Sequence, residues 1–165
     1  SDKPTFTLAY GTATGNAKAI ALEIAQIASN GDQQCLVQGP MELNALATKA
    51  AFTQLPERRV LVIVCSTTGD GEVPECAARF YRKLRMKLSE FEENEKQEDN
   101  DDRAKWLAYT HYAILGLGDS NYSQFNAAAR KLDDVIIKLG AKKFYYTGMG
   151  DDGTGFVSFY CFSLF

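Results

Sequence analysis

The chain has 165 residues, a formal net charge of −3 and 45% hydrophobic residues spread over separate segments. This length suffices for one domain with a substantial core and is too short for two domains of ordinary size. The charge balance and the acidic clusters argue against a nucleic-acid partner. No apolar stretch reaches the roughly 20 residues that a membrane-spanning helix needs.

The cysteines and the one histidine favour neither a disulfide framework nor a transition-metal site. The four cysteines, which form no C-x-x-C pair, are Cys35, Cys65, Cys76 and Cys161. Two of them lie in or beside apolar runs, and no secretory signal opens the chain, so we expect reduced thiols and a cytoplasmic location. His111 has no second histidine or paired cysteines beside it, and we expect no metal.

Apolar runs and helical periodicity alternate along the chain. Runs typical of buried strands lie at residues 5–10, 60–65, 112–117 and 143–147, with a weaker one near residues 35–37. About five strand–helix repeats predict a single α/β domain over residues 1–165, with a doubly wound, five-stranded parallel sheet covered by helices on both faces. Ligands of such sheets bind beyond the carboxyl ends of the strands, where the strand order reverses.

The helices are predicted from the spacing of apolar residues. The first helix places Ile20, Ile24 and Ile27 on one face. A short helix is expected around residues 42–52, and a longer one from Pro74 to about residue 88. The last helix has four apolar residues on one face: Leu132, Val135, Ile136 and Leu139.

Residues 89–103 interrupt this alternation. The segment holds eight acidic residues and one aromatic residue, which is too little apolar surface to order a chain. We therefore expect a mobile acidic insertion, with electrostatic steering of a partner as the alternative role.

The first strand turns into the first helix through a small, uncharged loop, residues 11–16. Unpaired backbone N–H groups and the positive end of a helix dipole favour an anion there, most often a phosphate. A Walker loop would continue with lysine after its last glycine, whereas Gly15 is followed by Asn16 and Ala17. The loop therefore suits one terminal phosphate, and a plain strand–helix connection is the alternative.

Two further loops follow neighbouring strands at the same edge of the predicted sheet. Residues 65–75, CSTTGDGEVPE, contain Gly69 and Gly71, which allow positive φ and close approach of the backbone to a flat ligand. Residues 116–130, GLGDSNYSQFNAAAR, contain Tyr122 and Phe125, and an aromatic ring at such an edge can stack on a planar group. A phosphate loop, a ring rim and a stacking face together predict a mononucleotide with a broad ring, and FMN fits.

Four segments carry a resemblance to a known family: GTATGNA, STTGDGEVPE, LGLGDSNYSQFNAAARKLDD and LGAKKFYYTGMGDD. They resemble the flavodoxin-like FMN domain of the NADPH-dependent diflavin reductases, which include the cytochrome P-450 reductase and methionine synthase reductase types. The resemblance covers about residues 5–153. It implies an electron-transfer domain that accepts electrons from a separate FAD/NADPH module and passes them singly to a haem, cobalamin or iron–sulfur acceptor. This chain would not be active with NADPH alone.

The resemblance also implies which residues bind FMN, and it implies no catalytic acid, base or nucleophile. The phosphate would be held by Thr12, Ala13, Thr14, Gly15, Asn16 and Ala17. One edge of the ring would be lined by Ser66, Thr67, Thr68, Gly69 and Gly71. The other rim would come from Leu117, Gly118, Asp119, Tyr122, Phe125 and Asn126, with Tyr122 stacked on the ring. Asp152 matches an acidic position near the flavin.

The sequence departs from the family at two places. Thr68 stands where many members have an aromatic residue that covers the second ring face, so that face is expected to be open. Residues 154–165 form an uncharged, aromatic-rich tail, where members continue into a polar-faced helix. Acidic residues near the loop edge would attract a basic-faced redox acceptor: Asp70, Glu72, Glu75, Asp119, Asp151 and Asp152.

Other functions stay open on the sequence alone. The chain could be a stand-alone flavodoxin-like electron carrier, or a flavodoxin-like interaction module that has lost FMN. A phosphorylation-switched receiver domain needs acidic residues at the end of the first strand, where Tyr10 and Gly11 stand. The GxGxxG pattern at residues 148–153 leaves too little chain after it for the βαβ unit of a dinucleotide site.

Overall fold

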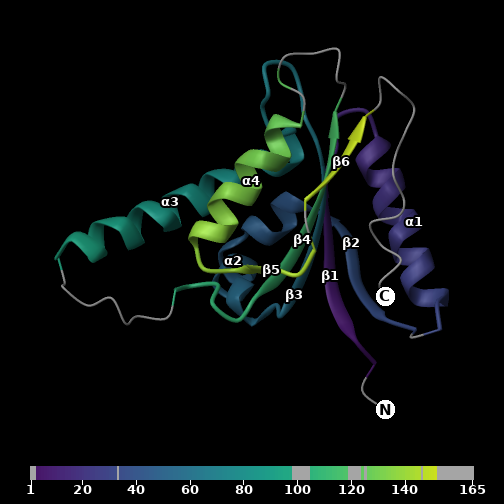
Figure 1. The fold of residues 1–165 in the computed structure, drawn as a ribbon, viewed down its shortest axis with the longest axis horizontal. Coiled ribbons are helices and arrows are strands. Elements are labelled where there is room, and N and C mark those ends of the chain that lie inside the picture. Colours follow the sequence, from purple (N-terminus) through teal and green to yellow (C-terminus); the bar gives the residue numbers. More distant parts are fainter. Residues whose placement is uncertain are drawn as a thin grey trace.

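The computed structural model describes residues 3–32, 34–97, 105–118, 124, 126–145 and 147–151. The main elements are β1 (Thr5–Gly11), α1 (Asn16–Asn30), β2 (Leu36–Glu42), β3 (Val60–Ser66), α3 (Glu75–Gln97), β4 (His111–Gly118), α4 (Ala127–Lys138), β5 (Lys142–Lys143) and β6 (Gly148–Asp151) (Figure 1). Short helices join β2 to β3, namely η1 (Leu43–Ala47), α2 (Lys49–Thr53) and η2 (Leu55–Glu57).

The strands form one parallel sheet in the order β2-β1-β3-β4-β5, and β6 also pairs with β4. Tyr112 pairs with Lys143 of β5, and Leu115 pairs with Gly148 of β6. β5 and β6 therefore form one edge strand with an interruption. The predicted doubly wound, five-stranded sheet is confirmed, and its strand order reverses between β1 and β3.

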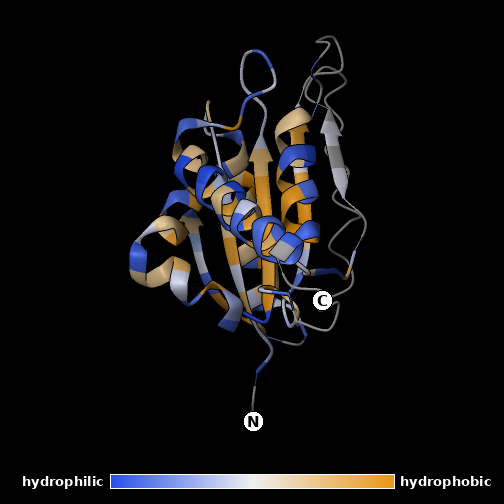
Figure 2. Ribbon diagram, turned by 90° about the vertical axis from the view of Figure 1, so that its left-hand side faces the viewer, coloured by the Kyte–Doolittle hydropathy of each residue, from blue (hydrophilic) through white to orange (hydrophobic). Residues whose placement is uncertain are grey.

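Helices cover both faces of the sheet (Figure 1), and Figure 2 is viewed from the side of α3 and α4. Side chains of β3 alternate between two cores, and the five residues between its two end residues are at most 1% exposed. Leu61 and Ile63 face the core shared with η1, α3 and α4, while Val62 and Val64 face the core under α1. Burial on both faces explains why this strand is continuously apolar in the sequence.

Two sequence predictions are wrong at the ends of elements. Ile27 is 59% exposed and does not belong to the buried face of α1, which consists of Ala17, Ile20, Ala21, Ile24 and Ala28. The strand expected at residues 143–147 ends at Lys143, and the edge strand resumes only at Gly148. Small alanines share the α1 face because they let the helix lie close to the strands.

The predicted insertion at residues 89–103 is wrong for its first part, because α3 continues to Gln97. Glutamate, lysine and glutamine are strong helix formers. Phe91 packs against the core, as does Trp106, and the Lys87 ammonium lies 5.3 Å from the Trp106 ring centroid. A helix that has already started therefore propagates through acidic residues. Residues 98–103 and the tail at residues 154–165 lie outside the described residues.

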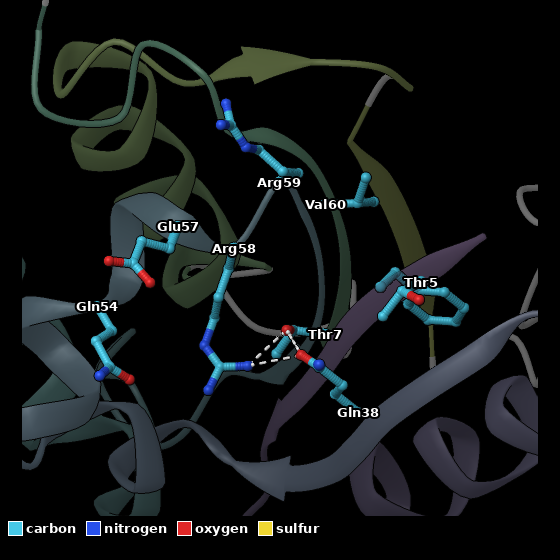
Figure 3. A pocket seen from close by; sticks show the side chains of 9 residues that line it. Thr5, Thr7, Gln38, Gln54, Glu57, Arg58, Arg59 and Val60 are labelled. Carbon is cyan, nitrogen blue, oxygen red and sulfur yellow. Dashed lines mark hydrogen bonds between the residues drawn. The ribbon is translucent and has the colours of Figure 1, made fainter. Parts of the chain in front are cut away.

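A cavity of about 380 Å³ lies at the amino ends of β1 and β3 (Figure 3). Arg58 Nη1 donates to Thr7 Oγ1 at 2.7 Å and to Gln38 Oε1 at 3.1 Å. These bonds tie the end of η2 to β1 and β2. The cavity lies at the opposite end of the sheet from the three predicted FMN-binding loops.

Candidate functional site

The first loop turns β1 into α1 with its own hydrogen bond. Thr12 Oγ1 accepts from the Gly15 N–H at 2.9 Å, and Gly15 has a left-handed φ of 96°. A Cβ at Gly15 would meet no atom within 4 Å, so its backbone conformation, not space, requires glycine. Gly15 has no side chain to cap α1, so the first N–H groups of the helix stay available for an anion.

Cys76 holds this loop from the other side. The Thr12 N–H donates to Cys76 Sγ at 3.2 Å, and the thiol donates to the Thr12 carbonyl at 3.5 Å. A Cβ at Gly11 would lie 3.0 Å from Ala77 Cβ and from Cys65 Sγ. The first turn of α3 therefore packs directly on the first loop. Sequence reasoning missed Cys76, because this contact joins residues 64 positions apart.

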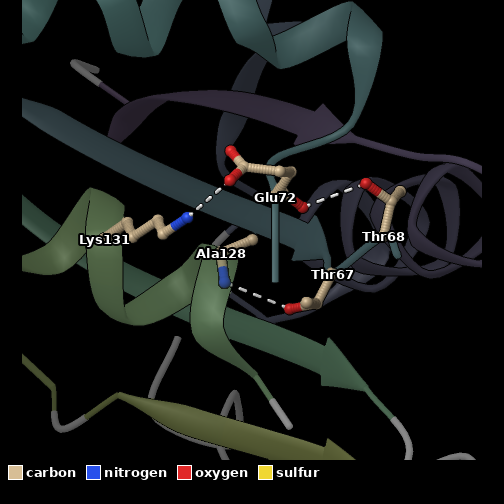
Figure 4. Close-up of polar contacts among 5 residues, drawn as sticks. All are labelled: Thr67, Thr68, Glu72, Ala128 and Lys131. Carbon is tan, nitrogen blue, oxygen red and sulfur yellow. Dashed lines mark hydrogen bonds and ion pairs between the residues drawn. The ribbon is translucent and has the colours of Figure 1, made fainter. Parts of the chain in front are cut away.

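The second loop folds into a tight turn between Thr68 and Glu72 (Figure 4). The N–H and the hydroxyl of Thr68 both donate to the Glu72 carbonyl, at 2.9 and 3.1 Å. Gly69 and Gly71 have φ values of 43° and 89°. A Cβ at Gly69 would meet nothing within 4 Å, so the tip of the turn has open space around it.

The same loop is joined to β4 and α4. The Thr67 N–H donates to the Leu117 carbonyl at 3.1 Å, and Thr67 Oγ1 accepts from the Ala128 N–H at 3.1 Å. Glu72 Oε1 lies 3.3 Å from Lys131 Nζ. The second loop is therefore bonded to the start of α4 by two contacts, Thr67 with Ala128 and Glu72 with Lys131 (Figure 4).

Asn126 is the last residue of the third loop before α4 and is the N-cap residue of that helix. It is fully buried, with a left-handed φ of 54°, and neither Oδ1 nor Nδ2 has a hydrogen-bond partner in the described structure. A Cβ at Gly116 would lie 2.6 Å from Ala129 Cβ and 3.0 Å from Asn126 Oδ1. Gly116 therefore lets the start of α4 lie against β4. A buried amide without a partner costs free energy.

The described site residues gather at the carboxyl ends of β1, β3 and β4, where these three strands run side by side (Figure 1). They are Thr12, Ala13, Thr14, Gly15, Asn16, Ala17, Ser66, Thr67, Thr68, Gly69, Gly71, Leu117, Gly118 and Asn126. Asp119, Tyr122, Phe125 and Asp152 lie outside the described residues. The reversal of strand order between β1 and β3 lies at this edge, which is where ligands of such sheets bind.

Other kinds of site have less support in the part of the chain that the structure describes. Gly148 and Gly150 belong to β6 and do not form a glycine-rich turn that opens a helix. Within the described ranges, no three His, Cys, Asp or Glu residues gather into a group that could hold a metal ion. No described helix is long and apolar enough to cross a membrane. Cys35, Cys65 and Cys76 are free thiols.

A family model described as flavodoxin matches residues 8–156. The chain belongs to the flavodoxin family. This flavodoxin domain is 33% identical over 150 residues to methionine synthase reductase of Caenorhabditis elegans, and 32% identical over 151 residues to that of Homo sapiens. Each alignment covers 91% of this chain and 19% of the relative.

A third relative and two solved structures agree with this result. NADPH–cytochrome P-450 reductase of Emericella nidulans is 32% identical over 146 residues, which cover 88% of this chain and 20% of that protein. A short-chain flavodoxin associated with a bacterial microcompartment has a TM-score of 0.65 at 23% identity, over 90% of this chain and 84% of that one. Fusobacterium nucleatum flavodoxin bound to flavin mononucleotide has a TM-score of 0.56 at 18% identity, over 90% and 75%. These structures show a shared fold.

Proposed function

We propose that this flavodoxin domain binds FMN and transfers electrons as part of an NADPH-dependent diflavin reductase. The observation that carries the proposal is that the carboxyl ends of β1, β3 and β4, from which the three loops start, lie side by side at the strand-order reversal, next to the uncapped start of α1. The matched relatives named as methionine synthase reductase and cytochrome P-450 reductase support it. Bound FMN would supply the one-electron redox chemistry, and the protein would set its exposure and potential.

The first loop fits the phosphate of FMN. Thr14 is exposed on the loop and its hydroxyl is not engaged in a bond between described residues. Together with the first N–H groups of α1, it would donate to the phosphate. Thr12 plays a different part, because its oxygen already accepts from Gly15 and shapes the turn. No lysine stands between Gly11 and Ala17, which suits a single phosphate group.

The second and third loops fit the two rims of a flat ring. The open tip at Gly69 leaves room for its peptide to turn toward the ring edge. Asn126, which directly precedes α4, is assigned to the opposite rim by the sequence resemblance. Asp119, Tyr122, Phe125 and Asp152 complete the proposal on the sequence resemblance, with Tyr122 as the stacking residue.

The proposed redox partners are inferred from the acidic residues at the site edge and from the greater length of the matched relatives. The chain spans 19% of the methionine synthase reductases that it matches, so FAD and NADPH would bind a separate module. Asp70 and Glu75 are exposed at the site edge and would favour an acceptor with a basic face. The Glu72 charge is partly offset by Lys131. We place this redox system in the cytoplasm.

Two alternatives have specific support. The solved neighbours that are named flavodoxins favour a stand-alone electron carrier of the same fold. Thr68 favours a module that has lost FMN, because its hydroxyl is engaged within the turn and its small side chain offers the ring no aromatic face. These alternatives differ in whether the chain takes up FMN and in whether a reductase module can reduce it.

An absorbance spectrum after addition of FMN and desalting tests the proposal directly. We expect the protein to retain one FMN per chain with a flavin spectrum altered by the site. Reduction of the bound flavin by NADPH is expected only when an FAD/NADPH module is added. Failure of the protein to retain FMN would contradict the proposal and would favour the alternative of an interaction module that has lost FMN.

A further inference from the structure

Thr67 connects the second loop to both ends of the third loop. Its N–H donates to the carbonyl of Leu117, near the end of β4, at 3.1 Å. Its Oγ1 accepts from the N–H of Ala128, the second residue of α4, also at 3.1 Å. The chain between these two partners is the segment that the sequence predicts to hold the far rim of the flavin. One residue thus bonds to both ends of that segment, at β4 and at the start of α4; Figure 4 shows the bond to Ala128.

The hydroxyl of Thr67 also takes the place of a helix cap. The N-cap residue of α4 is Asn126, whose side chain makes no capping bond. Serine, threonine, aspartate or asparagine at an N-cap normally accepts from the second or third N–H group of a helix. Here the accepting oxygen comes from a residue 61 positions earlier in the chain. The start of α4 is therefore held by the second loop and not by its own cap.

The backbone at Gly71 packs closely against the residues that lead into α4. A Cβ at Gly71 would lie 3.0 Å from Gln124 Cβ and 3.1 Å from Ala127 Cβ, and its φ is 89°. The ion pair between Glu72 and Lys131 adds a contact, but both side chains are substantially exposed, so it contributes little. The half-buried bond between Thr67 and Ala128 is the stronger of the two polar links.

We infer that Thr67 is a positioning residue, whose side chain holds the second loop against the start of α4 and thereby sets the separation of the two rims. This inference rests on the proposed FMN site and refines the role expected for Thr67 from the sequence, which was contact with the ring. Its oxygen is oriented toward the start of α4. Without that bond, the turn at Gly69 and the start of α4 are free to move relative to each other. The residues that line the ring edge are then less well ordered.

Thr67→Val tests this inference, because valine keeps the shape and removes the accepting oxygen. We expect at least a fivefold loss of FMN affinity, a changed visible circular dichroism of the bound flavin and faster hydrogen exchange of the Ala128 amide. Thr67→Ser keeps the oxygen and is expected to stay within twofold of the parent in affinity, with the parent dichroism. If Thr67→Val does not fold, Thr67→Ala removes the same oxygen with less bulk.

Thr48→Val is the matched control. Thr48 Oγ1 accepts from the Ala51 N–H at 3.2 Å and caps α2, so its loss removes a similar bond away from the three loops. We expect a comparable loss of thermal stability with FMN affinity and dichroism unchanged. If Thr67→Val behaves like Thr48→Val, the role of Thr67 is structural only and the inference is overturned.

Hydrogen exchange separates failure of this inference from failure of the proposed function. If the parent protein takes up no FMN, the proposed function fails, and exchange at the Ala128 amide still reports on the bond. Unchanged exchange of the Ala128 amide in Thr67→Val would show that the Thr67 oxygen does not hold the start of α4, and this would overturn the inference whether or not FMN binds. Faster exchange together with unchanged FMN affinity would overturn the positioning role.

Discussion

The sulfur of Cys76 lies 3.2 Å from the backbone nitrogen of Thr12, so the first turn of α3 holds the first peptide of the phosphate loop. We predict that Cys76→Ala weakens FMN two- to tenfold, as expected for the loss of roughly 0.5–1.5 kcal/mol of hydrogen bonding. Riboflavin, which lacks the phosphate, is expected to lose less. Titrations of both ligands by flavin fluorescence measure the difference.

The control for Cys76→Ala is Cys35→Ala. Cys35 is buried under α1, in the core on the other face of the sheet, and its loss is expected to lower stability without a preference between FMN and riboflavin. Equal weakening of both ligands by Cys76→Ala would mean that the thiol supports the fold in general and not the phosphate loop.

Thr14 is the residue of the first loop whose hydroxyl is left for a ligand. Thr14→Val removes one bond to a charged phosphate, worth roughly 1.5–3 kcal/mol, and we expect FMN to weaken by that amount while riboflavin changes little. Thr5→Val changes an exposed threonine at the opposite end of β1 and serves as the control in the same titration. A loss of both flavins to the same extent would refute the phosphate assignment.

The fold could be predicted from the sequence because its signals are local. Parallel strands buried on both faces are continuous apolar runs, as in β3, and glycine-containing turns between strand and helix have recognisable composition. The strands from which the predicted loops start do end at one edge of the sheet, since the topology brings the carboxyl ends of β1, β3 and β4 together. This much follows from pattern and strand order alone.

The remaining features depend on contacts between distant residues. The bonds of Cys76 to Thr12 and of Ala128 to Thr67 join positions more than 60 residues apart. No local sequence pattern around these residues predicts such bonds. Residues 89–97 were predicted from their charge, whereas their helix propensity and the packing of Phe91 decide their structure. A high density of acidic residues favours exposure to solvent. It does not prevent a helix that begins in a well-packed segment from continuing through those residues.

Gly116 is required by packing between β4 and α4. We predict that Gly116→Ala destabilises the protein by roughly 1–3 kcal/mol through overpacking, because its Cβ would lie 2.6 Å from that of Ala129. The displaced start of α4 would carry Asn126 with it, so FMN affinity is expected to fall as well. Urea unfolding and FMN titration measure the two effects. An unchanged free energy of unfolding would show that α4 shifts at no cost.

Stability is expected to fall at alkaline pH because of Cys65. Burial, with the nearby Cys76 as a smaller cause, raises the pKa of the Cys65 thiol from 9.0 to about 12. Below pH 9 the thiol keeps its proton in both states, so the stabilising contribution is fully present. Between pH 9 and 12 the unfolded thiol ionises while the folded one does not, and the free energy of unfolding declines.

Urea unfolding at pH 8 and pH 10 measures this decline, and Cys65→Ala is expected to make it shallower. Tyr112 begins to contribute at a higher pH than Cys65, because its ordinary pKa is 10.0 and burial, followed by the hydrogen bond to Asp133, raises it further. Tyr112→Phe therefore serves as the comparison at pH 10. If Cys65→Ala leaves the pH dependence unchanged, another group is responsible.

The final prediction concerns the charges beside the site. Asp70 and Glu75 are exposed where the second loop meets α3, and exposed charges act over a Debye length of about 8 Å at physiological salt. Electron transfer to a basic-faced acceptor should therefore slow from low to physiological ionic strength. Asp70→Asn and Glu75→Gln should each lower the rate at low salt and make the salt dependence shallower, because both remove attraction during the encounter.

Glu72 and Glu23 provide a graded comparison by stopped-flow kinetics. Glu72 lies at the same edge but is paired with Lys131 at 3.3 Å, so Glu72→Gln should have a smaller effect than Asp70→Asn. Glu23 is exposed on α1, and Glu23→Gln removes the same charge from the helix surface and should leave the salt dependence nearly unchanged. Equal effects of all four substitutions would mean that net charge, and not an acidic docking edge, governs the encounter.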